Sequence, residues 1–290
     1  MKKITLALSL LAMAASASAA NLYIIGDATP YGWSTDEATA LLSTAETPAV
    51  YTGTIYLKAD QNFKFMTVPD WGNTEYGAAP DASLTDGEIA LASGTDDNGY
   101  GQLRVPEDAN YLITVDTETL KATIVKSAYQ DTEIKLCSLF MVGSATAGGW
   151  SVDEGTPMFQ DAEAPYKYAA ANVNLAEGSF KIATVIKGGG SFDQKYFYFR
   201  SADNDGKMAL NQDGDLQWSI AETAAYDVTA NTLTDDLTIA PAGLSAITAV
   251  DADTDAPAEY FTLGGVKVVT PSAGLYICRR GDVVSKVVVR

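Results

Sequence analysis

The chain has 290 residues, of which 47% are hydrophobic, and it carries a formal net charge of −18 without a single histidine. This composition excludes a disordered acidic tail, and the negative charge disfavours nucleic acid and anionic membranes as partners. A Ser-His-Asp triad, a Cys-His pair and a histidine-based zinc site are all excluded because each of them needs histidine.

The N-terminus has the three parts of a secretory signal peptide. Lys2-Lys3 supply positive charge, residues 4–15 are apolar, and Ala17-Ser18-Ala19 is a cleavage site of small residues. We therefore expect residues 1–20 to be removed and the protein to be exported. The outer membrane or cell surface, the medium and the periplasm are all open as its location. No cysteine lies near the cleavage site, so we expect no lipid anchor at the N-terminus.

One passage of the chain is written twice. When residues 22–65 are aligned with residues 139–182, the two passages match without a gap. The two passages start 117 positions apart. A period of more than a hundred residues has the size of a domain and is too long for a solenoid unit. Tandem copies of a small domain suit multivalent binding better than they suit catalysis. The matched residues include Gly26 and Gly143, Trp33 and Trp150, and Lys64 and Lys181.

The expected elements are strands throughout. Short runs of β-branched and aromatic residues are punctuated by Gly, Asn, Asp and Pro about every ten residues. Residues 36–42 are the exception, and there we expect a helical turn. The pattern predicts an all-β chain with two tandem immunoglobulin-like β-sandwiches. The expected strands of the first repeat cover residues 22–25, 51–57, 62–66, 111–115 and 121–125.

The repeat also sets the expected domain boundaries. Cys137 and Cys278 lie in strand-like runs of different segments, so two buried free thiols are favoured over one disulfide. We expect β-sandwich repeat 1 over residues 21–127, a linker over 128–135, β-sandwich repeat 2 over 136–241 and a small C-terminal β module over 242–290. The strands expected in the module lie near residues 259–263, 266–269, 274–279 and 283–289.

The tryptophans are candidate platforms for a sugar. An indole ring can cover the apolar face of a pyranose while the sugar hydroxyls stay free for hydrogen bonds. Trp33 and Trp150 follow the first strand of each repeat, and they could equally be core residues that pin a loop. Trp71 lies in a loop of polar residues, where we expect it to bind a ligand. Trp218 aligns with Leu103 on a strand, so we expect it in the core.

The second repeat replaces the Trp71 loop with a different one. Gly188-Gly189-Gly190 makes that loop pliant. Phe192 and Tyr196 are its aromatic candidates, with Lys187 or Lys195 as hydrogen-bond donors. We therefore expect the second site to be weaker, altered or lost.

Three motifs of the first repeat carry a resemblance to a known family. They are Leu-Tyr-Ile-Ile-Gly-Asp-Ala-Thr-Pro-x-Gly-Trp at residues 22–33, Phe-Lys-Phe at 63–65 and Asp-Trp-Gly-x-x-x-Tyr-Gly at 70–77. Together they resemble the repeat of the SusE/SusF family, starch-utilisation proteins of the Bacteroidota cell surface. The resemblance covers residues 22–126 well and residues 139–240 moderately.

The resemblance implies β-sandwiches that bind an α-glucan without catalysis and without a cofactor or metal. It also makes other outer-membrane glycan-uptake proteins candidate partners. In the family, an aromatic arc binds the sugar beside basic or polar side chains. Carried over to this sequence, Trp33 and Trp71 would form the arc, with Tyr76 and Lys64 as partners. The candidates of the second repeat are Trp150, Lys181, Phe192 and Tyr196.

Other interpretations stay open. The C-terminal segment is similar to C-terminal β domains of secreted Bacteroidota proteins, some of which are type IX secretion signals, and a plain β module is the alternative. Residues 203–206 and 211–215 are similar to calcium loops, but hairpin turns are favoured. The second candidate function is a structural or adhesion protein that binds no glycan. The third is a hydrolase, which would need two positioned carboxylates.

Overall fold

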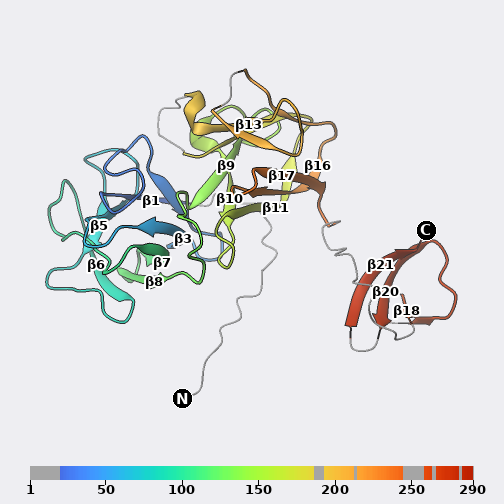
Figure 1. Cartoon of the computed structure of the whole chain (residues 1–290), viewed down its shortest axis with the longest axis horizontal. Coiled ribbons are helices and arrows are strands. Elements are labelled where there is room, and N and C mark those ends of the chain that lie inside the picture. Colours follow the sequence, from blue (N-terminus) through green and yellow to red (C-terminus); the bar gives the residue numbers. More distant parts are fainter. Residues whose placement is uncertain are drawn as a thin grey trace, which may run out of the picture. The chain divides into compact units, whose positions relative to one another are not determined.

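The computed structural model describes residues 20–185, 193–211, 214–243, 258–262, 266–280 and 283–289. Regular structure in these residues is almost entirely β-strand, which confirms the expected all-β class (Figure 1). The strands form three sheets, which follow one another along the chain. By its internal contacts the chain divides into two compact units, Met1–Ile239 and Ala240–Arg290.

The first sheet closes into a barrel-shaped domain. Its strands are β1 (Asn21–Ile25), β2 (Thr39–Leu42), β3 (Val50–Leu57), β4 (Lys64–Met66), β5 (Glu75–Ala78), β6 (Glu88–Gly94), β7 (Ala109–Asp116) and β8 (Lys121–Lys126). They pair in the order β1-β2-β3-β7-β8-β6-β5-β4, and β4 pairs with β1 again. Alternate residues of β7 point into the core, as the two-residue period of a strand requires. The five strands expected in this repeat are confirmed.

The helical turn expected at residues 36–42 is wrong. Thr39–Leu42 is strand β2, which runs antiparallel to β1. All four of its side chains are buried, Leu41 in the barrel core and Leu42 on the opposite face of the strand. A short apolar run that is buried on both faces has no two-residue alternation, so its pattern does not separate helix from strand.

The second sheet covers the second repeat. Its strands are β9 (Ser138–Val142), β10 (Thr156–Gln160), β11 (Lys167–Leu175), β12 (Gly178–Ala183), β13 (Phe197–Arg200), β14 (Met208–Leu210), β15 (Trp218–Ile220), β16 (Ala224–Asn231) and β17 (Asp236–Pro241). Single turns of 3-10 helix occur at Val152–Glu154 and Gln194–Tyr196. The strand order is β14-β13-β12-β9-β10-β11-β16-β17, with β15 on β12. Trp218 is 2% exposed and stacks on Phe180, which confirms its core position.

The C-terminal unit is a separate four-stranded sheet. Its strands are β18 (Glu259–Phe261), β19 (Lys267–Val268), β20 (Gly274–Arg280) and β21 (Val283–Val289), in the order β19-β18-β20-β21. These strands confirm the four expected in this segment. Cys278 is buried in this sheet and Cys137 in the core of the first barrel, and both are free thiols.

A third buried cluster joins the two repeats, and we call it the junction cluster. The first repeat contributes the outward-facing side chains of β1, β2 and β4, and the second contributes those of β9, β12 and β13. Residues from both repeats are fully buried together there, so the repeats share one hydrophobic core. The buried members are Tyr23, Ile25, Ala38, Ala40, Leu42, Met66, Phe140, Val142, Val152, Ala183, Phe197 and Phe199; Trp33, Phe159 and Tyr196 pack against it.

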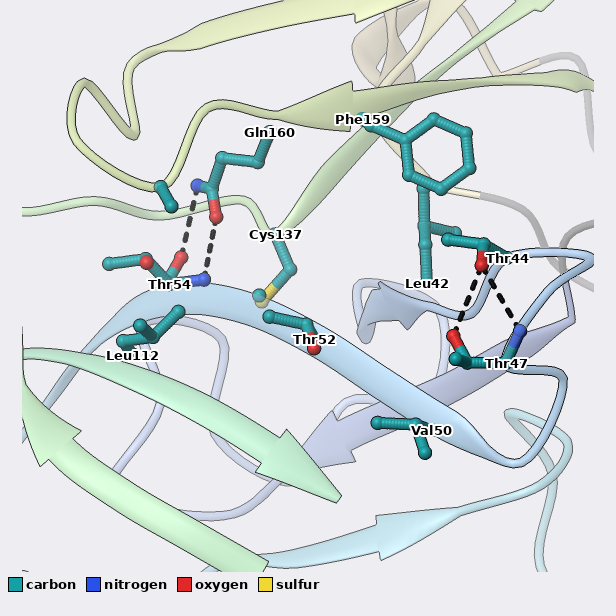
Figure 2. Close-up of a pocket in the computed structure, with 12 residues that line it drawn as sticks. Leu42, Thr44, Thr47, Val50, Thr52, Thr54, Leu112, Cys137, Phe159 and Gln160 are labelled. Atoms are coloured by element: carbon teal, nitrogen blue, oxygen red, sulfur yellow. Dashed lines mark hydrogen bonds between the residues drawn. The ribbon is translucent and has the colours of Figure 1, made fainter. Parts of the chain in front are cut away.

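Hydrogen bonds reinforce the junction beside this cluster. The Gln160 side chain accepts from Thr54 N at 2.6 Å and donates to Thr54 O at 3.1 Å, as Figure 2 shows. Gln160 Nε2 also lies within hydrogen-bond distance of Leu136 O and Pro165 O. A cavity of about 130 Å³ lies next to this contact, between strands of the two repeats. One amide thus ties the middle of β3 to the second repeat.

The segment between the two sheets is also held in place. The Asn110 side chain donates to Tyr129 O and Thr132 O and accepts from Ile134 N, with distances of 2.9 to 3.0 Å. Ile134 is 4% exposed. These contacts fasten the connecting segment to the first barrel, so the repeats are not joined by a loose tether.

Candidate functional site

A tight turn places Trp33 after the first strand of the first repeat. The amide of Gly26 donates to Gly32 O at 2.9 Å, and Thr29 Oγ1 donates to Gly26 O at 2.9 Å. A Cβ atom at Gly26 would lie 2.2 Å from Asn62 O, so only glycine fits there. The backbone at Gly26 thus passes close to the residues just before β4, the strand that pairs with β1, and this fixes the loop that carries Trp33.

The second repeat builds the same turn before Trp150. Gly143 donates to Gly149 O at 2.8 Å, and Thr146 Oγ1 donates to Gly143 O at 2.9 Å. A Cβ atom at Gly143 would lie 2.1 Å from Ser179 O. The duplicated sequence therefore gives a duplicated tryptophan position.

Trp71 lies at the tip of the hairpin between β4 and β5. The hairpin is closed by Thr67 N, which donates to Thr74 O at 3.0 Å. The amide of Trp71 donates to Asp70 Oδ1 at 3.0 Å, and Gly72 has a φ of +81°, which favours glycine. These contacts shape the loop, and the indole ring of Trp71 is about half exposed.

The two tryptophans of the first repeat meet, as expected. The ring centroids of Trp33 and Trp71 are 6.5 Å apart with an interplanar angle of 37°. Trp71 is 47% exposed, and Trp33 is partly buried. Lys64 Nζ lies 4.9 Å from the Trp71 centroid and 5.8 Å from that of Trp33, which is the distance range of a cation–π contact. The result is a tilted aromatic platform next to a lysine.

Lys64 is 1% exposed and belongs to an ionic network. Its Nζ lies 2.8 Å from Asp97 Oδ1, 2.9 Å from Glu75 Oε1 and 3.1 Å from the Tyr100 hydroxyl. Burial alone would lower the pKa of Lys64, but the contacts to Asp97, Glu75 and Tyr100 outweigh it and raise this pKa. The hydrogen bond from Lys64 lowers the pKa of Asp97. Burial, followed by the hydrogen bond to Glu75, raises the pKa of Tyr100 to about 12.

Tyr76, which the resemblance placed at this site, packs against the barrel core instead. It lies directly opposite Phe65 in the β4–β5 pair, and Phe65 is a buried core residue. Successive residues of a strand face opposite sides, so Lys64 and Tyr76 point to different faces of the sheet. Tyr100 is the tyrosine that contacts Lys64.

The second repeat brings Trp150 and Lys181 together. Lys181 Nζ lies 5.4 Å from the Trp150 ring centroid and 5.0 Å from the centroids of Phe197 and Phe199. It forms an ion pair with Asp215 at 2.9 Å, and Lys181 lowers the pKa of that carboxyl. Trp150 is 36% exposed, while Phe197 and Phe199 are buried in the junction cluster.

The remaining candidates of the second repeat lie elsewhere or outside the described residues. Tyr196 is partly buried against the junction cluster, with Lys195 Nζ 4.5 Å from its ring centroid. Phe192, Lys187 and the triple glycine lie outside the described residues. Among the residues that the structure describes, Trp150 is therefore the exposed ring of this site.

Sequence reasoning missed Glu75, Asp97 and Tyr100. Glu75 lies on β5, and the other two lie between β6 and β7. The sequence held a signal for the position of Asp97 and Tyr100, because Leu103 aligns with Trp218 and is therefore expected to pair like a strand residue. Leu103 forms a β-bridge to Phe63, the residue before Lys64. The residues just before Leu103, among them Tyr100, therefore lie beside the lysine.

The described residues give no sign of a metal site or a membrane-spanning helix. Within them, no group of three or more Cys, Asp or Glu side chains is placed to hold a metal ion. Residues 203–206 lie in the β13–β14 hairpin, where Asn204 Oδ1 accepts from Gly206 N at 2.9 Å, as expected for a turn. Gln212 and Asp213 lie outside the described residues. None of the helices in the described parts has the length and apolar character needed to cross a membrane.

Comparison with models of protein families agrees with the resemblance of the first repeat. Residues 21–124 match the family model described as SusF/SusE starch specific CBMs, which confirms that resemblance. The crystal structure of SusF from Bacteroides thetaiotaomicron is similar at 20% sequence identity and a TM-score of 0.30. That match covers 76% of this chain, which spans 47% of the solved chain. No curated protein matches the sequence.

Proposed function

We propose that this protein is an exported, non-catalytic binder of starch-like α-glucans. The sugar would stack on the platform formed by Trp33 and Trp71, with Trp150 as the platform of a second site. The observation that carries the proposal is the tilted pair of partly buried Trp33 and exposed Trp71, with ring centroids 6.5 Å apart, inside the segment that matches the starch-specific family model. Two rings inclined at 37° can follow the curvature of an α-linked chain better than one flat surface.

The geometry supports binding more than structural packing at this site. Trp71 is one of the most exposed large apolar side chains of the first repeat, yet hydrogen bonds fix its loop. A rigid exposed ring loses little conformational entropy when a ligand covers it. The second site has a similar lysine and tryptophan, but its described part offers a single exposed ring. We propose that the first site binds more tightly.

Affinity electrophoresis in gels that contain amylopectin or pullulan tests the proposed function. Slower migration in these gels than in polysaccharide-free gels is the expected result. Unchanged migration in every polysaccharide would favour a structural or adhesion protein. Release of reducing sugar during long incubation would favour a hydrolase, so the three candidate functions give three different outcomes.

Replacing Trp71 with alanine is expected to weaken maltoheptaose binding by about 1–3 kcal/mol, the size of an aromatic hot spot. The free energy of unfolding should change by less than about 0.5 kcal/mol, as for other exposed positions. Calorimetric titration and urea denaturation measure the two quantities. Trp150→Ala is the matched control, and its effect on binding should be smaller. A large loss of stability with unchanged binding would show that Trp71 is a structural residue.

We propose further that residues 242–290 act in export or attachment at the cell surface. This unit has its own sheet, and residues up to Ile239 form a compact unit by themselves. Deleting the segment should therefore leave the two repeats folded and change where the protein accumulates. Cell fractionation of the truncated protein measures this. An unchanged location together with a destabilised second repeat would make the segment structural.

A further inference from the structure

We infer that one face of the C-terminal sheet, which we call the open face, docks on an anionic membrane surface through its basic and apolar side chains. The open face is the side of the sheet that carries Leu275, Lys286 and Val288. Its ligands are the phosphates of lipid headgroups. This inference rests on the proposed role of residues 242–290 in attachment, because it names the surface to which they attach, and it does not depend on glucan binding.

Strand register defines the open face. Directly opposed residues of an antiparallel pair lie on the same side of a sheet, and successive residues of one strand alternate between the two sides. Leu275 on β20 is opposite Val288 on β21. Two residues along β20, Ile277 is opposite Lys286. The register of β18 and β19 with β20 gives the remaining members of the open face, which are Arg279, Glu259, Phe261 and Lys267.

The two sides of this sheet differ in exposure. On the open face both lysines and the arginine are exposed, and so are Leu275 at 39% and Val288 at 52%. The residues between them in sequence face the other side. There the rings of Tyr260 and Tyr276 contact edge to face, and Cys278 is 5% exposed. Side chains therefore pack on one side of the sheet, and the open face is the more accessible side.

The segment that carries this face also differs from the rest of the chain in charge. Residues 258–290 hold five basic and two acidic side chains, a net charge of +3. Residues 21–257 hold 12 basic and 35 acidic side chains, a net charge of −23. The overall negative charge, which disfavours an anionic membrane as a partner, therefore does not describe this segment. Exposed charges more than about 8 Å apart are largely screened at physiological salt, so the local charge decides what the open face attracts.

The exposed apolar side chains favour a membrane over an acidic protein as the partner. Four of the ten exposed large apolar side chains in the described part of the chain belong to this small unit, and Val269 is 91% exposed. An anionic membrane attracts Lys and Arg to its headgroups and takes apolar side chains into the region below them. An acidic protein surface would match the lysines but would leave the valines against polar groups. At a lipid surface, both kinds of side chain find a suitable environment.

Vesicle co-sedimentation of residues 21–290 tests the inference. This chain contains every strand that the structure describes, and it lacks the apolar segment at residues 4–15, which could bind lipid itself. A basic group near an anionic surface changes the affinity about fivefold, so binding to phosphatidylglycerol vesicles should be about 100-fold tighter than to phosphatidylcholine vesicles. Lys286→Glu reverses one charge of the open face and should weaken this binding about 25-fold. Lys267 is less suitable for the test, because it pairs with Glu259 at 2.5 Å.

Lys58→Glu is the matched control, because Lys58 is an exposed lysine of the first repeat, and it should leave vesicle binding unchanged. Residues 21–241, which lack the C-terminal sheet, should not bind the vesicles. Raising the salt to about 0.5 M should release the unsubstituted chain, and this measurement needs no variant. Equal binding to the two kinds of vesicle, or equal effects of Lys286→Glu and Lys58→Glu, overturns the inference.

The outcomes separate this inference from the proposed role in attachment. If deletion of residues 242–290 changes where the protein accumulates but the chain binds no vesicles, the role stands and the inference alone is overturned. Dimers in analytical ultracentrifugation, together with no vesicle binding, also overturn it and assign the open face to a second copy of the chain. If the chain binds anionic vesicles through Lys286 but the deletion leaves its location unchanged, the docking is supported and the proposed role fails.

Discussion

Replacing Lys64 with methionine is expected to destabilise the first barrel by about 3–5 kcal/mol, the cost of leaving a buried charge without its partner. Glu75 is 0% exposed and lies 2.9 Å from Lys64 Nζ, so the substitution strands a carboxylate inside the protein. Methionine has a similar length and is apolar, which limits the change in packing. Urea denaturation followed by tryptophan fluorescence measures the loss.

Lys126→Met is the matched control for this prediction. Lys126 forms an ion pair with Glu107 at 2.8 Å, but the two side chains are 47% and 59% exposed. An exposed pair of this kind contributes about 0–1 kcal/mol. The double variant Lys64→Met with Glu75→Gln should recover part of the loss, because it removes the stranded charge. Equal costs for Lys64→Met and Lys126→Met would show that the network around Lys64 does not stabilise the fold.

Replacing Phe140 with alanine is expected to cost about 3–5 kcal/mol and to uncouple the unfolding of the two repeats. Phe140 is 1% exposed in the junction cluster, which also contains side chains of the first repeat such as Tyr23. The wild-type residues Met1–Ile239 form one compact unit, so a single cooperative transition is expected for them. Differential scanning calorimetry should show two transitions in the variant.

Leu139→Ala separates the loss of the junction from the loss of stability alone. Leu139 is the neighbour of Phe140 on β9, but its side chain points into the core of the second repeat. The two substitutions should cost similar amounts, yet only Phe140→Ala should split the transition. One transition in both variants would mean that the junction cluster does not couple the repeats.

The parts of the site that repeat in the sequence could be predicted from it. The family resemblance placed Lys64 with Trp33, the repeat supplied Trp150 and Lys181 as their counterparts, and the structure brings both pairs together. Trp218 could be placed in the core because it aligns with Leu103 on a strand. The first pairing needed the family resemblance, and the other predictions needed only local pattern and the alignment of the chain with itself.

The ionic network could not be predicted because it depends on closure of the barrel. Glu75, Asp97 and Tyr100 reach Lys64 only when β5 and the segment before Leu103 pack beside β4. The position of Tyr76 depended on strand register, since a shift of one residue reverses the face on which a side chain lies. No local pattern gives that register.

The junction between the repeats did leave a trace in the sequence. Residues 22–25 are Leu-Tyr-Ile-Ile, and residues 139–142 are Leu-Phe-Met-Val, all apolar without alternation. Such runs are typical of strands buried on both faces. One face of each run fills its own domain and the other fills the junction cluster. The prediction of two separate sandwiches did not explain why the second face of each run is also apolar.

Part of the junction cluster is built from equivalent residues of the two repeats. Ile25 corresponds to Val142, and Met66 corresponds to Ala183, and all four lie in it. Contact between the same surface on two copies is isologous, the geometry of a two-fold dimer. Such a contact is self-complementary, so it joins two copies and leaves no equivalent surface free for a third. The tandem resembles such a dimer only at these positions, because the first repeat also contributes β2 to the junction cluster and the second contributes β13.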